Sequence, residues 1–290
     1  MSHKKKSGKK KRLILIGAVL ICIFLGVWTI WGNKAVIMSE FSVSSPRLPS
    51  SFSGYCIAQV SDLHNTEFGE GNTTLLQMLS KCQPDIIVIT GDLIDAQHTN
   101  IEVALDFSKG ATQIAPTYYV TGNHEASSSD YAILKDGLEV AGVVILEDEA
   151  IYLERNGETI TLLGLADSDF TIKGGLFGEV PAMVSTKLKN MLEQDTVYSV
   201  LLSHRPELFE TYVACGVDLV LSGHAHGGQI RLPIVGGIIA PDQGLFPKYD
   251  AGLFTDGNTN MIVSRGLGNS IIPIHFNNCP EVILVEFNAE

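Results

Sequence analysis

One stretch, LVLSGHAHGGQ at residues 219–229, decides how the rest of the chain is interpreted. Its apolar start predicts a buried strand, and its glycines allow a sharp turn where that strand ends. His224 and His226 lie two positions apart on the turn, where both rings can face one small volume. Imidazole is the commonest protein metal ligand, so the pair indicates a metal site. An isolated pair of this spacing can also be purely structural, so the interpretation depends on matching ligands elsewhere.

Other apolar runs in the chain predict strands of the same kind. Strands are expected at 55–60, 86–90, 117–120 and 197–202, and helices at 75–81 and 101–114. Such strands, rich in β-branched residues, are typically buried on both faces, as in a parallel sheet covered by helices. Ligands bind beyond the carboxyl ends of strands in open α/β sheets. Because each of these runs ends in a polar cluster, we expect the clusters to converge in space.

The second half of the chain is predicted to be richer in short strands. We expect strands at 143–146, 151–155, 160–166, 261–264 and 281–285, a helix at 183–193, a hairpin through 230–232, and a long loop from Gly236 to Gly257. Asn156-Gly157 is a strong signal for a tight hairpin turn between two of these strands. Pro206 suits the first turn of a helix after the fourth buried strand.

Eight polar residues lie at the strand ends, namely Asp62, His64, Asp92, Asn123, His124, His204, His224 and His226. Seven of them, all except His124, are candidate metal ligands. Alone, each carboxylate would be interpreted as a turn or cap residue, the asparagine as a turn residue, and His204 as a packed core histidine. Their recurrence in five separate strand-end clusters favours a shared metal site instead.

The chemistry of this set indicates two metal ions. Carboxylate, amide and imidazole ligands suit divalent Mn, Fe, Zn or Co, and the set does not select among them. Seven ligands are too many for one ion, whereas two ions ~3.5–4 Å apart need a shared carboxylate. Asp92 is the natural bridge. Such a pair orients a phosphate ester, generates hydroxide near neutral pH and stabilises an in-line displacement.

The amino-terminal region predicts a membrane anchor. Seven of the 20 basic residues lie within residues 1–12, which contain no acid, and the remaining thirteen oppose all 32 acidic residues. An acidic body argues against a nucleic-acid-binding surface. Residues 13–31 are apolar and uncharged, close to the ~20 residues that a helix needs to cross a bilayer. Trp28 and Trp31 lie at the far end, where interfacial aromatics are expected.

We therefore divide the chain into a basic cytoplasmic head at 1–12, a single transmembrane anchor at 13–31, a serine- and proline-rich linker at 32–53, and a folded domain at 54–290 outside the cytoplasm. A cleaved signal peptide is the alternative. Signal peptides have a shorter apolar region and then a small-residue site, whereas the nearest small residue here, Ala35, follows Asn33-Lys34. Cys22 follows Ile21 rather than the small residue that a lipoprotein signal requires.

The motifs Asp62-x-His64, Gly91-Asp92, Gly122-Asn123-His124, His204 and Gly223-His224-x-His226 together resemble the calcineurin-like metallophosphoesterase superfamily. The resemblance covers essentially all of residues 54–290. The stretches at 90–93, 227–229 and 264–268 are similar to the membrane-associated bacterial branch related to UDP-2,3-diacylglucosamine pyrophosphatase-type phosphodiesterases. The implied fold is α/β, a four-layer α/β/β/α sandwich of two mixed sheets.

The resemblance also implies roles for the candidate residues. Asp62, His64 and His226 would hold one metal, Asn123, His204 and His224 the other, and Asp92 both. His124 would lie beside the phosphate as general acid or charge stabiliser. The implied function is hydrolysis of a phosphodiester or pyrophosphate by metal-bound hydroxide. The alternatives are a phosphomonoesterase of the 5′-nucleotidase type and a metal-binding scaffold without turnover.

Three features leave alternatives open. The branch leads us to expect a basic residue near position 275, where this chain has His275, interpreted as a surface-loop residue. Glu125 is interpreted either as a residue that orients a ligand or as a carboxylate at a helix amino terminus. The stretch Leu245–Phe254, with Phe246, Tyr249 and Phe254, predicts either contact with a lipid substrate or packing on the sheet.

Overall fold

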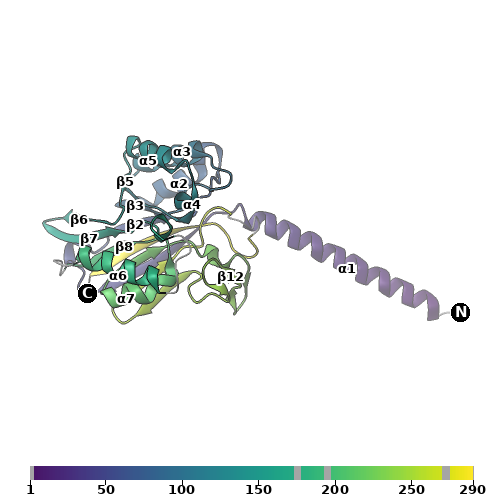
Figure 1. Cartoon of the computed structure of the whole chain (residues 1–290). Coiled ribbons are helices and arrows are strands. Elements are labelled where there is room, and N and C mark those ends of the chain that lie inside the picture. Colours follow the sequence, from purple (N-terminus) through teal and green to yellow (C-terminus); the bar gives the residue numbers. More distant parts are fainter. Residues whose placement is uncertain (1–2, 173–177, 193–196, 270–274, 290) are drawn as a thin grey trace.

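The structure is a computed structural model that describes residues 3–172, 178–192, 197–269 and 275–289. One long helix leaves a body in which two sheets lie between two sets of helices (Figure 1). The predicted four-layer α/β/β/α sandwich is confirmed.

Each sheet has six strands, of which the central ones are parallel. The first sheet has the order β1 (Ile37–Ser45), β16 (Glu281–Ala289), β2 (Cys56–Val60), β3 (Ile86–Thr90), β4 (Thr117–Val120) and β5 (Val144–Ile145). The second has the order β14 (Gly252–Asp256), β15 (Thr259–Val263), β9 (Leu219–Ser222), β8 (Ser199–Leu202), β7 (Glu158–Gly164) and β6 (Glu149–Arg155). Strands β2 to β5 are parallel in the first sheet, as are β15, β9, β8 and β7 in the second.

Helices cover the outer face of each sheet. The structure has the helices α1 (His3–Gly32), α2 (Thr73–Cys82), α3 (Ile101–Thr112), α4 (Asn123–Ser127), α5 (Tyr131–Val140), α6 (Glu179–Leu192) and α7 (Phe209–Cys215), with short 3₁₀ turns at 50–52, 70–72, 168–170, 206–208 and 226–228. Apolar side chains of α2, α3 and α5 pack on the first sheet, and those of α6 and α7 pack on the second. Figure 1 shows these two groups on opposite sides of the sheets.

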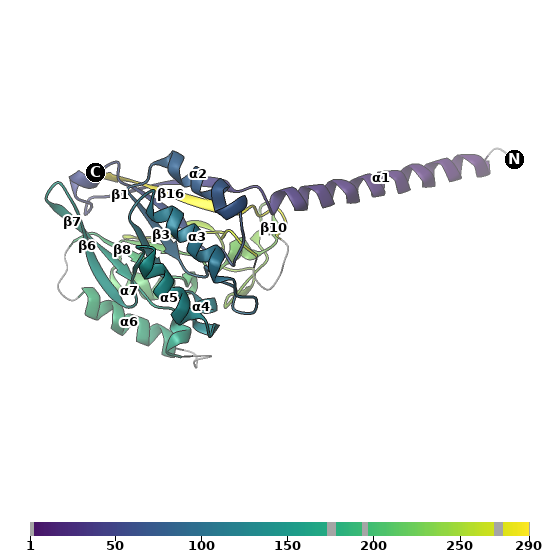
Figure 2. The same cartoon turned by 90° about the horizontal axis from the view of Figure 1, so that it is seen from above.

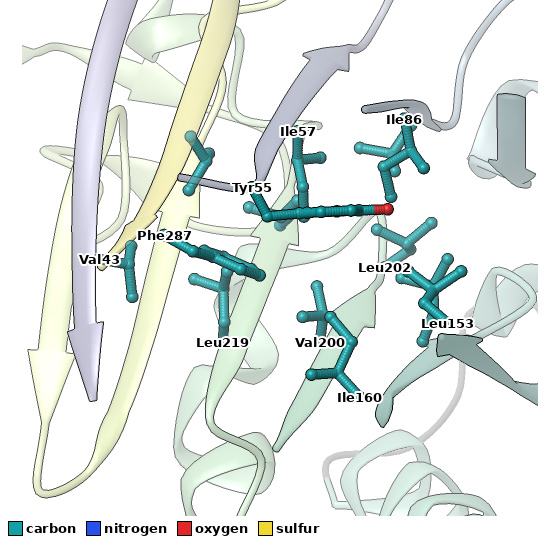
Figure 3. Close-up of a cluster of buried hydrophobic side chains, with 14 of the residues drawn as sticks. Val43, Tyr55, Ile57, Ile86, Leu153, Ile160, Val200, Leu202, Leu219 and Phe287 are labelled. Atoms are coloured by element: carbon teal, nitrogen blue, oxygen red, sulfur yellow. The ribbon is translucent and has the colours of Figure 1, made fainter. Parts of the chain in front are cut away.

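The strands are apolar on both faces because both faces are covered. In β3, Ile86 and Val88 point into the core between the sheets, whereas Ile87 and Ile89 face the helices. Alternation of this kind follows from the two-residue period of a strand. Figure 3 shows the inner core, in which Ile57 of the first sheet and Val200 and Leu219 of the second lie in one cluster.

The prediction of a linker at 32–53 was wrong for most of this segment. Residues 37–45 form β1, which pairs in parallel with the carboxy-terminal strand β16 from Ile37↔Glu281 to Ser45↔Ala289. Phe52 is completely buried in the inner core, and Val43 nearly so. Arg47 contacts Asp218 at 2.6 Å between Nη1 and Oδ1. The folded body therefore includes residues from Ile37 onward.

Two further segments differ from expectation. The predicted loop from Gly236 to Gly257 contains β11 (Gly236–Gly237), β12 (Ile239–Ala240), β13 (Gly244–Leu245) and β14. Strand β10 (Arg231–Leu232) pairs with β11, and β12 pairs with β13, so this segment forms two small antiparallel ribbons. The hairpin at Asn156-Gly157 is confirmed, because Arg155 pairs with Glu158 and both turn residues have positive φ.

Helix α1 includes the apolar run and most of the basic head. Its segment Lys10–Gly32 is long and apolar enough to cross a membrane by length and composition. The large apolar side chains from Leu13 to Trp31 are all exposed. The helix projects away from the body in both views (Figures 1 and 2), so the body does not cover its apolar surface.

The burial of Phe52 yields a test of the revised boundary. We expect Phe52→Ala to lower the free energy of unfolding by about 3–5 kcal/mol, because it removes a fully buried ring from the core. The measurement is guanidinium unfolding of the full chain in detergent, with the neighbouring exposed Ser53→Ala as control. Equal midpoints for the two variants would mean that this segment lies outside the cooperative fold.

Candidate metal centre

The predicted ligands lie where strands of both sheets end. Asp62 follows β2, Asp92 follows β3 and Asn123 begins α4 after β4; His204 follows β8 and His224 follows β9. The buried side chain of Gln59, in β2, joins the two sheets at the ends of these strands. Its Nε2 donates to Thr90 Oγ1 at 3.0 Å in the first sheet and to Ser222 O at 2.9 Å in the second. The structure thus brings together clusters that lie far apart in the sequence.

Asp62, His64 and His226 form one group of buried side chains. The Nε2 atoms of His64 and His226 are 3.1 Å apart, and Asp62 Oδ1 is 3.4 Å from His226 Nε2. At most one of the two nitrogens can donate a proton to the other. A cation accepting a lone pair from each would satisfy both, so the geometry of this group fits a metal ion.

His204, His224 and Asn123 form the second group. His204 Nε2 is 3.2 Å from both Asn123 Oδ1 and His224 Nδ1. The opposite nitrogen, His204 Nδ1, is 2.7 Å from the carbonyl oxygen of Thr90 and donates to it. Holding one imidazole nitrogen in this way orients the other toward a metal.

Asp92 lies between the two groups. Its Oδ2 is 3.2 Å from His204 Nε2 and 3.6 Å from His64 Nε2. Asp62 Oδ1 is only 4.0 Å from His204 Nε2, so the groups form a single cage. An unprotonated His204 Nε2 facing carboxylate and amide oxygens needs a proton or a cation between them. Although burial opposes it, the Asp92 and Asp62 carboxylates raise the pKa of His204 to about 10, so that a proton takes this place when no cation does.

The backbone of the cage is strained. Five of the seven candidate ligands have left-handed φ angles between 45° and 66°, namely Asp62, His64, Asp92, His224 and His226. This region is uncommon for residues other than glycine, and such residues cluster at functional sites. Gly223 is required beside them, because a Cβ there would lie 1.9 Å from Ser61 Oγ and 2.4 Å from Asp62 Oδ2.

His124 lies at the edge of the cage with its ring centroid 4.4 Å from that of His64. The backbone N–H of Ala96 donates to His124 Nδ1 at 3.0 Å. This bond places the proton of the neutral ring on Nε2, which makes Nε2 a hydrogen-bond donor. Asp95 Oδ2 is 3.7 Å from Nδ1. Asp95 was not among the predicted site residues, although its place three residues after Asp92 was a usable signal.

Glu125 satisfies both interpretations offered for it. The completely buried carboxylate lies at the start of α4 and accepts the backbone N–H groups of Gly122 at 2.7 Å, Asp92 at 2.8 Å and Ile94 at 3.2 Å. It therefore ties the Asp92 loop to the Asn123 loop. Burial and then the charge of Asp92 raise the pKa of Glu125 to about 7.

A second network, which the sequence analysis did not predict, holds His224. Asp242, between β12 and β13, accepts from His224 Nε2 and from Arg205 Nη1, both at 2.9 Å. The other arm of Arg205 binds Asp167 through two bonds of 2.8 and 2.9 Å. The hydrogen bond from His224 holds the pKa of Asp242 at about 2. With Nε2 engaged in this way, the Nδ1 of His224 faces the cage. Asp242 lies in irregular chain without periodicity, so no sequence signal identified it.

The interpretation of His275 as a surface-loop residue was wrong. Its side chain is buried, with its ring centroid 5.9 Å from that of His226. Burial lowers the pKa of His275 to about 4, which leaves the ring neutral. The position where a basic residue was expected thus holds an uncharged ring packed against a candidate ligand.

The chain is similar to known proteins along much of its sequence. The profile of the family described as calcineurin-like phosphoesterase matches residues 56–228. The uncharacterized metallophosphoesterase YkuE of Bacillus subtilis (strain 168) is 30% identical over 249 residues, which are 84% of this chain and 82% of that protein. The phosphodiesterase YaeI of Escherichia coli (strain K12) is 28% identical over 207 residues, 70% of each chain.

Among solved structures, the protein TT1561 of Thermus thermophilus matches with a TM-score of 0.51 and 14% identity, over 74% of this chain and 91% of that one. At this identity the likeness shows a shared fold alone. The family profile matches more than half of the sequence, and the Bacillus relative matches along most of it. The chain therefore belongs to the calcineurin-like phosphoesterase family and is a phosphoester hydrolase.

Proposed function

We propose that the cage binds two divalent metal ions. Asp62, His64 and His226 would hold one ion, and Asn123, His204 and His224 the other, with Asp92 shared by both. The observation that carries the proposal is the place of the Asp92 carboxylate, within 3.2 and 3.6 Å of an imidazole nitrogen from each group. Manganese, iron and zinc all accept this mixture of ligands.

The reaction we propose is hydrolysis of a phosphodiester or pyrophosphate. When bound, two such ions draw charge from the phosphoryl group and make water nucleophilic near neutral pH. His124 donates a hydrogen bond from Nε2 to the leaving oxygen and stabilises the charge that develops there. Glu125 holds the loops of Asp92 and Asn123 at a constant separation. Asp242 keeps the Nδ1 of His224 directed into the cage.

Two observations support a diesterase within the family. A relative that matches 70% of this chain is named a phosphodiesterase. The segment at 264–268, which carries the resemblance to UDP-2,3-diacylglucosamine pyrophosphatase-type enzymes, packs directly on the Asp62 loop, where Leu267 N donates to Ser61 O at 3.1 Å and Gly268 N to Asp62 O. A Cβ at Gly266 would lie 2.8 Å from the Cβ of Asp62, so this close approach depends on glycine.

We further propose that α1 anchors the enzyme in a membrane by a single span. The basic residues that precede the apolar run would remain in the cytoplasm by the positive-inside rule. The body from Ile37 onward would then lie outside the cytoplasm, where it can act on lipid headgroups, envelope polymers or external phosphoesters.

Metal content tests the role of Asp92. We expect the protein purified with manganese to retain two ions per chain, and Asp92→Asn to retain one or none, because the neutral amide cannot share charge between two cations. Elemental analysis after gel filtration gives the stoichiometry. The exposed Asp136→Asn is the matched control. Two ions retained by Asp92→Asn would exclude Asp92 as the bridging ligand.

Turnover tests the role of His124. We expect His124→Ala to lower kcat for bis-p-nitrophenyl phosphate by about 10²–10⁴, the usual contribution of a positioned proton donor, while bound metal is unchanged. His98→Ala, which removes an exposed ring, should have the wild-type rate. Faster cleavage of p-nitrophenyl phosphate than of the diester would assign a monoesterase. No cleavage of either ester would assign a scaffold without turnover.

Stability tests the positioning role of Glu125. We expect Glu125→Gln to lower the free energy of unfolding by about 1–3 kcal/mol, because its NH₂ group would face backbone donors that now have an acceptor. The change should also lower kcat, because the two loops it joins carry Asp92 and Asn123. The exposed Glu139→Gln is the control for both measurements. Identical unfolding and identical kcat in the two variants would exclude a positioning role for Glu125.

A further inference from the structure

Six large apolar side chains are exposed within a short segment beside the metal centre. They are Ile230, Leu232, Ile234, Val235, Leu245 and Phe246, here called the apolar rim. Ile234 is fully exposed, and Leu245 and Phe246 are about two-thirds exposed. Tyr249 and Phe254, in contrast, pack into the core on the second sheet. The packing interpretation of the Leu245–Phe254 stretch therefore holds for Tyr249 and Phe254, whereas Leu245 and Phe246 remain exposed. Gathered exposed apolar residues of this kind mark surfaces of interaction.

The apolar rim is joined to the root of helix α1. Asn33, directly after the helix, exchanges two hydrogen bonds with the backbone of His275, donating to its O at 2.7 Å and accepting from its N at 2.9 Å. The next residue, Phe276, pairs with Ile230, and Arg231 N donates to Phe276 O at 3.0 Å. Hydrogen bonds through His275 and Phe276 thus connect the end of the helix to Ile230, the first residue of the rim.

The rim lies at the end of the body where α1 leaves it. Figure 1 shows β12 beside the root of the helix, and Figure 2 shows β10 there in the perpendicular view. A bilayer spanned by α1 would therefore face this end of the body. The rim and the helix thus both expose large apolar side chains at this end of the body.

The segment from Ile230 to Phe246, which carries the rim, also lies against the metal centre. Asp242, between the β12 and β13 strands of the rim ribbon, holds His224 Nε2 at 2.9 Å. Ile238 N donates to Gly228 O at 3.1 Å, two residues after His226. The segment that exposes the rim side chains to solvent thus also contacts the loop that carries His224 and His226.

We propose that the apolar rim inserts into the membrane leaflet next to the root of α1, and that the metal centre therefore acts on phosphoesters carried by lipids of that leaflet. The insertion depends on α1 and the rim alone, whereas the substrate class rests on the proposed function. In the reaction, water forms a new P–O bond and the ester P–O bond breaks. The leaving oxygen takes up one proton of the attacking water and departs as the alcohol.

Bromolipid quenching tests the insertion without any use of activity. The full chain carries Trp28→Phe and Trp31→Phe, which remove its two tryptophans, together with Phe246→Trp. It is reconstituted in dioleoyl phosphatidylcholine and phosphatidylglycerol vesicles, with or without lipids brominated near the headgroup. We expect bromolipid to quench the emission. The control is Tyr152→Trp on β6, similarly exposed but at the opposite end of the body (Figure 1), which should not be quenched.

Equal quenching at the two positions would overturn the insertion. Emission of the Phe246→Trp variant that is shielded from both bromolipid and acrylamide would also overturn it, because a protein surface, such as a second copy of this chain, would then cover the rim.

A pair of matched esters tests the substrate class. Bis-p-nitrophenyl phosphate is soluble, whereas p-nitrophenyl hexadecyl phosphate inserts in vesicles, and both release p-nitrophenolate. We expect the double variant Leu245→Ser, Phe246→Ser to hydrolyse the vesicle-borne ester about tenfold more slowly than wild type, since two large apolar side chains lose their lipid contact. Its rate on the soluble ester should be unchanged, and Tyr152→Ser should resemble wild type on both.

A wild-type enzyme that cleaves the soluble ester and ignores the vesicle-borne one, or a double variant with wild-type rates on both, would overturn this assignment and leave the proposed diesterase intact. Absence of cleavage of either ester by wild type, together with quenching of the Phe246→Trp variant, would refute the diesterase and the substrate class and support the membrane contact.

Discussion

The carboxylate of Asp92 lies between two groups of buried imidazoles, and the surrounding structure keeps it there. Its Oδ1 accepts the backbone N–H of His124 at 2.9 Å, and its own N–H is held by Glu125 at 2.8 Å. Gly122 approaches so closely that a Cβ there would lie 2.2 Å from Asp92 Oδ1. A buried carboxylate is costly unless it is paired and hydrogen-bonded. The ends of β3 and β4 supply these partners. The segments after β8 and β9 supply three of the imidazoles, and the segment after β2 supplies the fourth, His64.

Electrostatics explains why the cage suits cations. Asp62 and Asp92 are almost completely buried, and both accept backbone N–H groups; Asp62 accepts that of His224 at 3.1 and 3.2 Å. The remaining oxygen directions face imidazole nitrogens. Protons can occupy this space only by charging histidines that burial would otherwise keep neutral, as the lowered pKa of His64 illustrates. Divalent ions neutralise the carboxylates and leave the imidazoles uncharged, which is the state in which imidazole is a ligand.

The strands and the cage could be predicted from sequence because their signals are local. Every central strand is a short apolar run, and each candidate ligand directly follows one. Strand β1 has no such signal: only Val43 is buried in it, and its serines are half-exposed or exposed along a sheet edge. Its pairing depends on β16, at the far end of the chain. The burial of His275 and the contact of Asp242 with His224 also depend on long-range packing of irregular chain. The sequence could not decide between the two interpretations of Glu125, because its three backbone donors come from two separate loops.

Anomalous diffraction from manganese-loaded crystals tests the central claim most directly. We expect two peaks ~3.5–4 Å apart, the usual separation in two-metal sites. One should lie among Asp62, His64 and His226 and the other among Asn123, His204 and His224, with Asp92 touching both. A single peak in the cage, or peaks found on surface carboxylates alone, would contradict the binuclear centre.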